Sequence, residues 1–277
     1  MGRIAVALTG GTALGAVQVF STENLLIDYC PIDIDFFGCS TGSITASKAA
    51  ENRIDQLYSA YGELDGAKDF QQCNWKIWKG LFNLTPLYNL LAKYNSAGNL
   101  VTNAYVGIWS PRPKEYRNVR LNDLPAGHQR WQHVIASCSM PGIHRAVWID
   151  DRWWLDGGVR NVIPDIGDPH QYDEIHVISC SPVYVEQRST RDDADPDDQR
   201  KANTVFEQLN ATFEEWTDLV MATNMRRVEE WSKSTPVKIY APTSWSQVGR
   251  PFDASRETIH NRLYTVGPEL WESRYWL

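Results

Sequence analysis

The chain of 277 residues lacks the features that mark several large classes of protein. It has only five cysteines, and no two of them are spaced as C-x-x-C, so neither a disulfide framework nor a zinc finger is indicated. No stretch of 18 apolar residues occurs, so we predict no membrane-spanning helix. The net charge is −7 and no Lys/Arg run exceeds two residues. We therefore expect no nucleic-acid partner.

A secretory signal is the alternative interpretation of the first twenty residues, because Arg3 precedes an apolar stretch. Gly10 and Gly11 would break a signal helix early, so the segment fits better as a buried strand that leads through a turn into a helix. The scattered cysteines are then free thiols in a reducing compartment. We expect a cytoplasmic protein that acts at the periphery of a membrane surface.

The remaining pattern predicts one α/β domain over 1–277. An apolar run at 3–8 precedes a helical pattern at 14–28, and a second run at 32–37 precedes one at 43–61. This alternation predicts a three-layer α/β/α fold with a mostly parallel central sheet. Further strands are expected at 104–109, 116–121, 146–149, 152–155, 173–180 and 237–240, with helices at 129–138 and 203–233.

Two segments interrupt the alternation. Residues 63–100 are rich in aromatic and leucine side chains within an otherwise polar stretch, and we interpret them as a helical insertion or lid. These side chains either bind an acyl chain or a bilayer surface, or simply pack the insertion onto the sheet. Residues 186–201 are highly charged and almost free of apolar side chains, so they are expected to form a mobile acidic surface loop.

The most specific motif is a G-x-S-x-G that runs from Gly38 to Gly42 between a predicted strand and a predicted helix. That context is what a nucleophile elbow requires. The turn would expose the Ser40 hydroxyl at a helix N-terminus, where free N–H groups favour developing negative charge. Ser40 is therefore the candidate nucleophile, and a plain structural turn is the alternative.

A second glycine-rich turn, from Gly10 to Gly15, follows the first strand. It fails as a dinucleotide fingerprint because Thr12 takes the place of the second glycine, and as a phosphate loop because Ala16-Val17 replaces the lysine and the hydroxyl residue. The turn remains suited to offering bare backbone N–H groups as an oxyanion hole. A tight turn without a ligand is the alternative.

Asp156 is the candidate base for Ser40. It ends the strand at 152–155 and is followed by Gly157 and Gly158, which permit close approach of the backbone. A carboxylate held beside a hydroxyl in a water-poor site can accept its proton. Asp-Gly is also a common turn signal, so a structural turn is the alternative.

Histidine and metal chemistry are the competing possibilities. A Ser-His-Asp triad of the α/β-hydrolase type would use His170, His176 or His260. In that fold the elbow follows several strands, whereas Ser40 follows only two. No H-E-x-x-H motif is present, and the step from His128 to His133 does not share one helical face, so no metal site is predicted.

The three motifs, in this order, resemble those of the patatin-like phospholipase family. In that family a G-G-G-x-R-G oxyanion loop precedes a G-x-S-x-G nucleophile and a D-G-[GA] that carries the acid of a Ser-Asp dyad. The corresponding segments here are ALTGGTALGA, FFGCSTGS and WLDGGVRNVIP, and ASCSMPGIHRAV and DEIHVISCSP are also similar to family segments. The resemblance covers most of 3–182, and FDASRETIHNRLYTVG is similar to the family's final helix.

The resemblance implies a serine lipid acyl hydrolase of the phospholipase A or lysophospholipase type that needs no cofactor. Ser40 would be the nucleophile, Asp156 the base, and Gly10, Gly11 and Thr12 the oxyanion donors. The loop departs from the family pattern at Thr12 and at Leu14, which replaces the basic residue. An inactive binding or scaffolding protein with the same fold is therefore the alternative, and a lipid aggregate or membrane is the expected partner.

Overall fold

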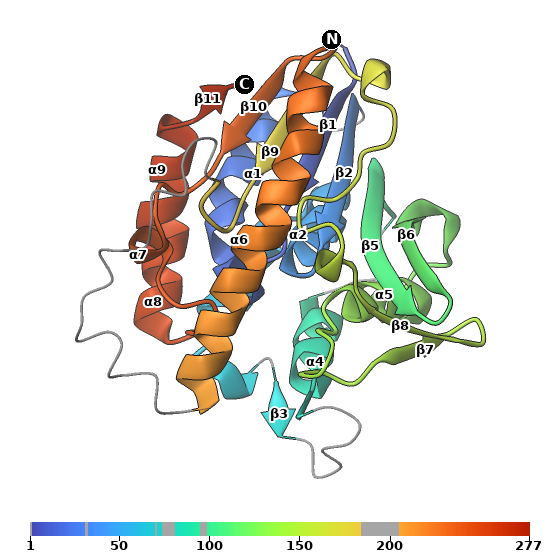
Figure 1. Ribbon diagram of the computed structural model, residues 1–277, viewed down its shortest axis with the longest axis vertical. Helices are drawn as coiled ribbons and strands as arrows, with labels where there is room; N and C mark the ends of the chain where they lie inside the picture. The colour runs from blue at the N-terminus through green and yellow to red at the C-terminus, as the bar shows by residue number, and fades with distance from the viewer. Residues whose placement is uncertain (1, 31–32, 70, 74–80, 95–98, 184–204) are drawn as a thin grey trace.

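The computed structural model describes most of the chain and places a single large sheet at its centre (Figure 1). The described residues are 2–30, 33–69, 71–73, 81–94, 99–183 and 205–277. The predicted acidic loop at 186–201 and three aromatic residues of the predicted insertion, Phe70, Trp75 and Trp78, lie outside them.

The central sheet follows the order β11-β10-β9-β1-β2-β5-β8-β7, and β6 pairs with β5. Its inner strands, β10 to β5 in this order, are parallel, as the strand and helix alternation predicts. The parallel strands are β1 (Ile4–Leu8), β2 (Ile34–Cys39), β5 (Asn103–Pro111), β9 (Glu174–Ile178) and β10 (Val237–Tyr240). The outer antiparallel strands are β6 (Lys114–Arg120), β7 (Val147–Ile149), β8 (Arg152–Asp156) and β11 (Tyr275–Trp276).

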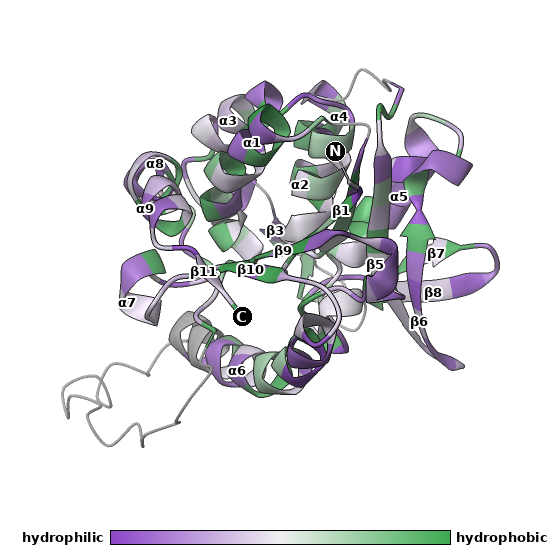
Figure 2. Ribbon diagram, turned by 90° about the horizontal axis from the view of Figure 1, so that it is seen from above, coloured by the Kyte–Doolittle hydropathy of each residue, from purple (hydrophilic) through white to green (hydrophobic). Residues whose placement is uncertain are grey.

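Helices cover both faces of the sheet, which gives the predicted three layers (Figures 1 and 2). One face is covered by α6 (Val205–Ser232). The other is covered by α1 (Gln18–Asp28), α2 (Thr41–Ala50) and α3 (Asp55–Gly62), with α8 (Arg256–Asn261) and α9 (Gly267–Glu272) beside them.

Strand β1 shows why both faces need cover. Val6 and Leu8 pack in the core beneath α1 and α2, whereas Ala5 and Ala7 pack in the core beneath α6. Successive side chains of a strand point to opposite faces, so a continuous apolar run is buried on both sides. All four residues are fully buried.

The remaining helices lie around the end of the sheet at which β2 ends. They are α4 (Thr85–Tyr94), α5 (His128–Ser137) and the short α7 (Trp245–Val248). The two-residue strands β3 (Gln72–Cys73) and β4 (Phe82–Asn83) pair antiparallel in a separate small sheet. No helix among the described residues combines the length and the apolar character needed to cross a bilayer.

The structure agrees with one prediction made from the local sequence and differs from another. The strands expected at 146–149 and 152–155 form as the β7–β8 hairpin, and its turn residues Asp150 and Asp151 both have positive φ (49° and 57°), as a type I′ turn requires. The single helix expected over 43–61 was wrong: the chain forms α2 and α3, separated by a break at Asn52. Asn52 has φ 57°, a left-handed conformation that ends a helix and that asparagine tolerates.

Candidate active site

Ser40 occupies the turn between β2 and α2, which is the context that the motif predicts. Its φ is 52°, a left-handed value that few residues other than glycine adopt. Hydrogen bonds hold this conformation from both sides. The Ser40 N–H donates to the Ser137 hydroxyl (2.9 Å), and the Ser40 carbonyl accepts from the N–H (2.9 Å) and the hydroxyl (2.6 Å) of Ser43. Ser40 itself is buried, with 7% of its surface exposed.

The two glycines of the elbow are required by close backbone packing. A Cβ on Gly38 would lie 2.2 Å from the Gly42 carbonyl oxygen, and a Cβ on Gly42 would lie 2.2 Å from the Leu8 carbonyl oxygen. Because both obstacles are backbone atoms, no side chain can move aside to make room. The first turn of α2 can therefore lie against the ends of β1 and β2 only with glycine at both positions.

The sheet register carries Asp156 to the same edge as Ser40. In β5, Gly107 pairs with Cys39 of β2, and the next residue, Ile108, pairs with Asp156 of β8. A Cβ on Gly157 would lie 2.5 Å from the Gly107 carbonyl carbon and oxygen, so glycine allows the chain after β8 to lie directly on β5. Only one strand, β5, thus separates the strands that carry the serine and the carboxylate, and both residues lie at the same end of the sheet.

Four groups surround the Asp156 carboxylate and backbone. The Gly158 N–H donates to Oδ1 (2.8 Å), and the Cys39 Sγ lies 3.6 Å from the same oxygen. The Asp156 N–H donates to the Ser139 carbonyl (2.9 Å), which fixes the start of the turn. The Ser40 side chain lies near enough to the carboxylate to lower its pKa. The structure therefore brings Ser40 and Asp156 close together.

Burial dominates the electrostatics of this pair. It raises the pKa of Asp156 to about 6, against the opposing effect of hydrogen bonds from Ser40, Gly158 and Cys39. Burial, together with the Asp156 charge, also raises the pKa of the Cys39 thiol well above its usual value. At neutral pH the carboxylate is therefore ionised and more basic than an exposed aspartate, while Cys39 remains a protonated donor.

The glycine-rich loop lies against the elbow, and its three candidate donors are not equivalent. A Cβ on Gly10 would lie 2.9 Å from the Ser40 Cβ, which shows how closely the loop approaches. The Gly10 N–H donates to the Val162 carbonyl (3.2 Å), so we do not retain Gly10 as an oxyanion donor. For the N–H groups of Gly11 and Thr12 no acceptor is recorded within the described parts of the chain.

Thr12 adopts the conformation that glycine would adopt without strain. Its φ is 52°, which is unusual for a β-branched residue. The Thr12 hydroxyl donates to the Pro251 carbonyl, which also accepts from the Ala13 N–H (3.2 Å). Gly15 is needed next to this turn, because a Cβ there would lie 2.0 Å from the Thr41 Oγ1. Contacts from the C-terminal part of the chain thus help to shape the loop.

Comparison with known proteins decides the family. The family model described as "Patatin-like phospholipase" matches residues 6–164, more than half of the chain, and this range includes both Ser40 and Asp156. The chain belongs to the patatin-like phospholipase family. Membership supports lipid acyl ester hydrolysis as the general activity.

A solved structure, VipD from Legionella pneumophila, aligns with a TM-score of 0.47 and 11% sequence identity, and the alignment covers 100% of this chain and 68% of that one. The search of curated proteins found no significant match.

The histidines of this patatin-like protein bear on the Ser-His-Asp alternative. All six lie in described segments, and none is recorded as a partner of Ser40 or Asp156. His176 lies within β9 and contacts Tyr240 (2.9 Å) and Glu174 (3.1 Å), His170 is exposed before β9, and His260 is exposed on α8. The geometry therefore does not favour the Ser-His-Asp alternative.

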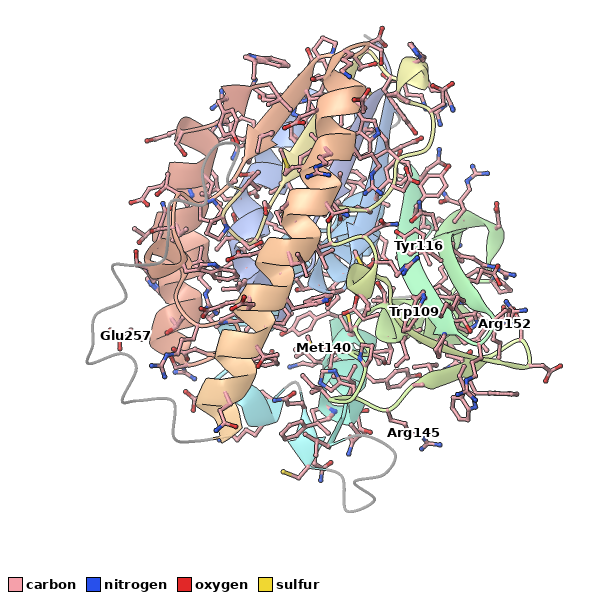
Figure 3. The ribbon with its side chains drawn as sticks, in the orientation of Figure 1. Trp109, Tyr116, Met140, Arg145, Arg152 and Glu257 are labelled. Carbon is pink, nitrogen blue, oxygen red and sulfur yellow. The ribbon has the colours of Figure 1, made fainter. Side chains whose placement is uncertain are left out.

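An apolar cavity opens beside Ser40 and Thr12. Its volume is about 830 Å³, including space that is open to solvent. The apolar side chains that line it come mainly from α2, α3 and α4: Ile44, Leu57, Ala60, Leu64, Leu84, Leu87, Leu90 and Leu91. Met140, labelled in Figure 3, lines the cavity from the segment that follows α5. Part of the predicted insertion thus forms a cavity wall, through α4.

Two polar residues in the cavity wall are held by neighbours. His144 accepts from the Met140 N–H at Nδ1 (3.2 Å) and lies 3.1 Å from the Gln71 Oε1 through Nε2, and burial lowers its pKa to about 4. Lys48 donates to Glu51 (2.8 Å), Gln56 (2.9 Å) and the Tyr94 carbonyl (2.8 Å). His144 is therefore neutral, with both ring nitrogens engaged. Within the described residues, no group of three or more His, Cys, Asp or Glu side chains is placed to hold a metal ion.

Proposed function

We propose that the protein is a serine lipid acyl hydrolase, of the phospholipase A or lysophospholipase type, that cleaves carboxylic esters through a Ser40–Asp156 dyad. The observation that carries the proposal is that Ser40 and the buried Asp156 carboxylate lie close together beside an apolar cavity. The hydroxyl supplies a nucleophile, the buried carboxylate supplies a base, and the cavity suits a hydrocarbon chain.

The reaction proceeds in two steps. Asp156 accepts the Ser40 proton as Oγ attacks the ester carbonyl carbon, and the N–H groups of Gly11 and Thr12 donate to the oxyanion. Collapse of this intermediate breaks the ester C–O bond, and the leaving alcohol takes the proton from Asp156. A water molecule then transfers a proton to Asp156 and attacks the acyl-enzyme, which releases the fatty acid and restores the Ser40 hydroxyl.

The rigid backbone around Ser40 suits this mechanism. A donor that is already aimed at the oxyanion is worth about 3 kcal/mol of barrier lowering, because nothing has to reorganise during the reaction. Left-handed residues such as Ser40 and Thr12 each cost roughly 1–3 kcal/mol and are retained only where the surroundings enforce them. Two such residues in adjacent turns are consistent with a preorganised catalytic site.

Binding without hydrolysis is the alternative raised by the changes at Thr12 and Leu14. Thr12 nevertheless takes the left-handed conformation. Its N–H donates a hydrogen bond to no backbone carbonyl among the described residues. Leu14 is fully buried in an apolar cluster with Val17 and Leu270, so it fills a packing site. These observations favour an intact oxyanion loop and hence hydrolysis.

The pH dependence of hydrolysis is the first prediction. Only the ionised Asp156 can accept a proton, so kcat/KM for p-nitrophenyl butyrate should be level above about pH 7 and fall about tenfold per unit below its pKa of about 6. Thermal unfolding measured at each pH separates this effect from acid denaturation. An acid limb near pH 4 would show that an ordinary exposed carboxylate, and not Asp156, governs the rate.

The cavity prediction concerns acyl chain length. Ala60 lines the cavity on α3, so Ala60→Phe should fill space that a long acyl chain needs. We expect kcat/KM for p-nitrophenyl decanoate to fall about tenfold or more, while that for the acetate changes less than about twofold. The acetate ester is the internal control for folding and for the dyad. Equal losses on both esters would place the acyl chain outside this cavity. If the wild-type protein hydrolysed neither ester, that result would contradict the proposed function.

A further inference from the structure

Arg262 is fully buried, at the C-terminal side of α8, and its guanidinium binds backbone carbonyls. Nε donates to Val248 (2.9 Å), Nη2 to Arg250 (2.8 Å), and Nη1 to both Asp253 (2.6 Å) and Ala13 (3.2 Å). The first three acceptors belong to one segment, residues 248–253. The fourth belongs to the glycine-rich loop beside Ser40.

Segment 248–253 in turn holds the glycine-rich loop. The Pro251 carbonyl accepts from the Thr12 hydroxyl and from the Ala13 N–H (3.2 Å). Residues 12–13 are therefore bound twice, directly by Arg262 at the Ala13 carbonyl and indirectly through Pro251. A planar guanidinium with five fixed donors can bridge several carbonyls at once, which the ammonium of lysine cannot do with the same geometry.

Arg262 and Pro251 hold the glycine-rich loop at its strained residue, Thr12. Thr12 has φ 52°, which a β-branched residue adopts only when its surroundings enforce it. The loop carries Leu14 rather than a basic residue, and a guanidinium reaches the same loop from a position 249 residues after Ala13. Arg262 also lies outside the part of the chain that the family model matches, 6–164.

We propose that Arg262 is a positioning residue for acyl transfer: it fixes segment 248–253 against the glycine-rich loop and thereby keeps Thr12 in the conformation that aims the oxyanion donors at the ester. The inference rests on the proposed function. Arg262 does not touch the reacting atoms, so its effect is transmitted through Ala13 and Pro251.

The experiment compares Arg262→Lys, Thr12→Gly and the double variant, with Arg3→Lys as the matched control. Arg3 binds the buried Asp35 (2.6 Å) at the opposite end of the sheet, so the same change there should not alter hydrolysis. With p-nitrophenyl butyrate, Arg262→Lys should lower kcat about tenfold or more, because small displacements of catalytic groups are costly, while KM changes less than about twofold.

The Thr12 variants test the transmission of this effect. Glycine adopts positive φ without strain, so Arg262→Lys introduced into Thr12→Gly should lower kcat by less than about threefold relative to Thr12→Gly itself. Thr12→Val keeps the strained β-branched residue but lacks the hydroxyl that binds Pro251, so it should lose about tenfold in kcat without any change at Arg262. This variant keeps the proposal testable even if Arg262→Lys does not fold.

Hydrogen exchange separates the two proposals. Amides at 11–17 should exchange faster in Arg262→Lys than in wild type, while amides of β5 stay protected. Unchanged exchange at 11–17, an additive double variant, or wild-type kcat in Thr12→Val would overturn the role of Arg262. Inactive wild-type protein with the expected exchange pattern would instead contradict the proposed function and leave the attachment of the loop supported.

Discussion

Replacement of Ser40 by alanine should lower kcat for p-nitrophenyl esters and for phospholipid about 10⁴-fold or more, because the hydroxyl that forms the acyl-enzyme is removed. Hydrolysis by a water molecule in its place would lack the covalent step. The fold should persist, since the N–H and the carbonyl of residue 40 keep their bonds to Ser137 and Ser43.

Ser47→Ala is the matched control for this change. Ser47 is a buried serine on the same helix, and its hydroxyl donates to the Ile44 carbonyl (2.9 Å), away from the carboxylate. It should retain activity within about twofold, as expected for a residue that contacts no reacting group. Turnover by Ser40→Ala within about tenfold of wild type would rule out Ser40 as the nucleophile.

Asp156→Asn should also lower kcat by about 10⁴-fold, the size of loss seen when a carboxylate that serves a catalytic proton transfer is replaced by an amide. An amide has nearly the same shape but cannot accept the Ser40 proton at accessible pH. The Gly158 N–H can still donate to the amide oxygen, so the turn after β8 should keep its geometry.

The same variant should be more stable than wild type at alkaline pH, and the sign follows from the pKa. The folded-state pKa of Asp156 is raised from 3.8 to about 6, so ionising this carboxylate costs up to about 3 kcal/mol of folding free energy. The cost is absent below about pH 4, grows between about pH 4 and 6, and is fully present above. Asparagine removes it, which should raise the melting temperature at pH 8 by roughly 5–10 °C and by little at pH 4.

Asp35→Asn provides the opposite control. Asp35 is buried at the other end of the sheet, where it accepts from Arg3 (2.6 Å), Asn103 (2.8 Å) and Tyr172 (3.0 Å). Loss of its charge leaves Arg3 without its ion-pair partner, so this variant should be less stable and fully active. If Asp156→Asn behaved like Asp35→Asn in both measurements, Asp156 would be a structural aspartate.

Local sequence patterns were sufficient for the elbow and for the strand that carries Asp156. Strand, G-x-S-x-G and helix are consecutive in the chain, so their arrangement is fixed by residues that are neighbours in sequence. The β7–β8 hairpin is likewise local, with Asp150-Asp151 at its turn. Only the resemblance to a family joined these separate motifs into one site, since no local pattern predicts that β2 and β8 lie on either side of β5.

The parts that sequence reasoning missed depend on contacts between distant residues. Ser137 and Ser139, which bind the backbone of Ser40 and Asp156, follow from how α5 packs against β5. Gly10 looked like an oxyanion donor, yet its N–H is taken by Val162, a residue 152 positions later. Pro251 carries no motif, and the resemblance of 252–267 to the family's final helix assigns no role to Arg262. Their contacts with the glycine-rich loop are visible only in the folded chain.

Covalent labelling with a fluorophosphonate, followed by peptide mapping, tests most directly whether Asp156 activates Ser40. We expect one modified residue, Ser40, with a labelling rate that rises with pH through about 6 in wild type. In Asp156→Asn the rate should fall by orders of magnitude and lose that pH dependence. Labelling at any other residue, or labelling of Asp156→Asn at the wild-type rate, would contradict the dyad.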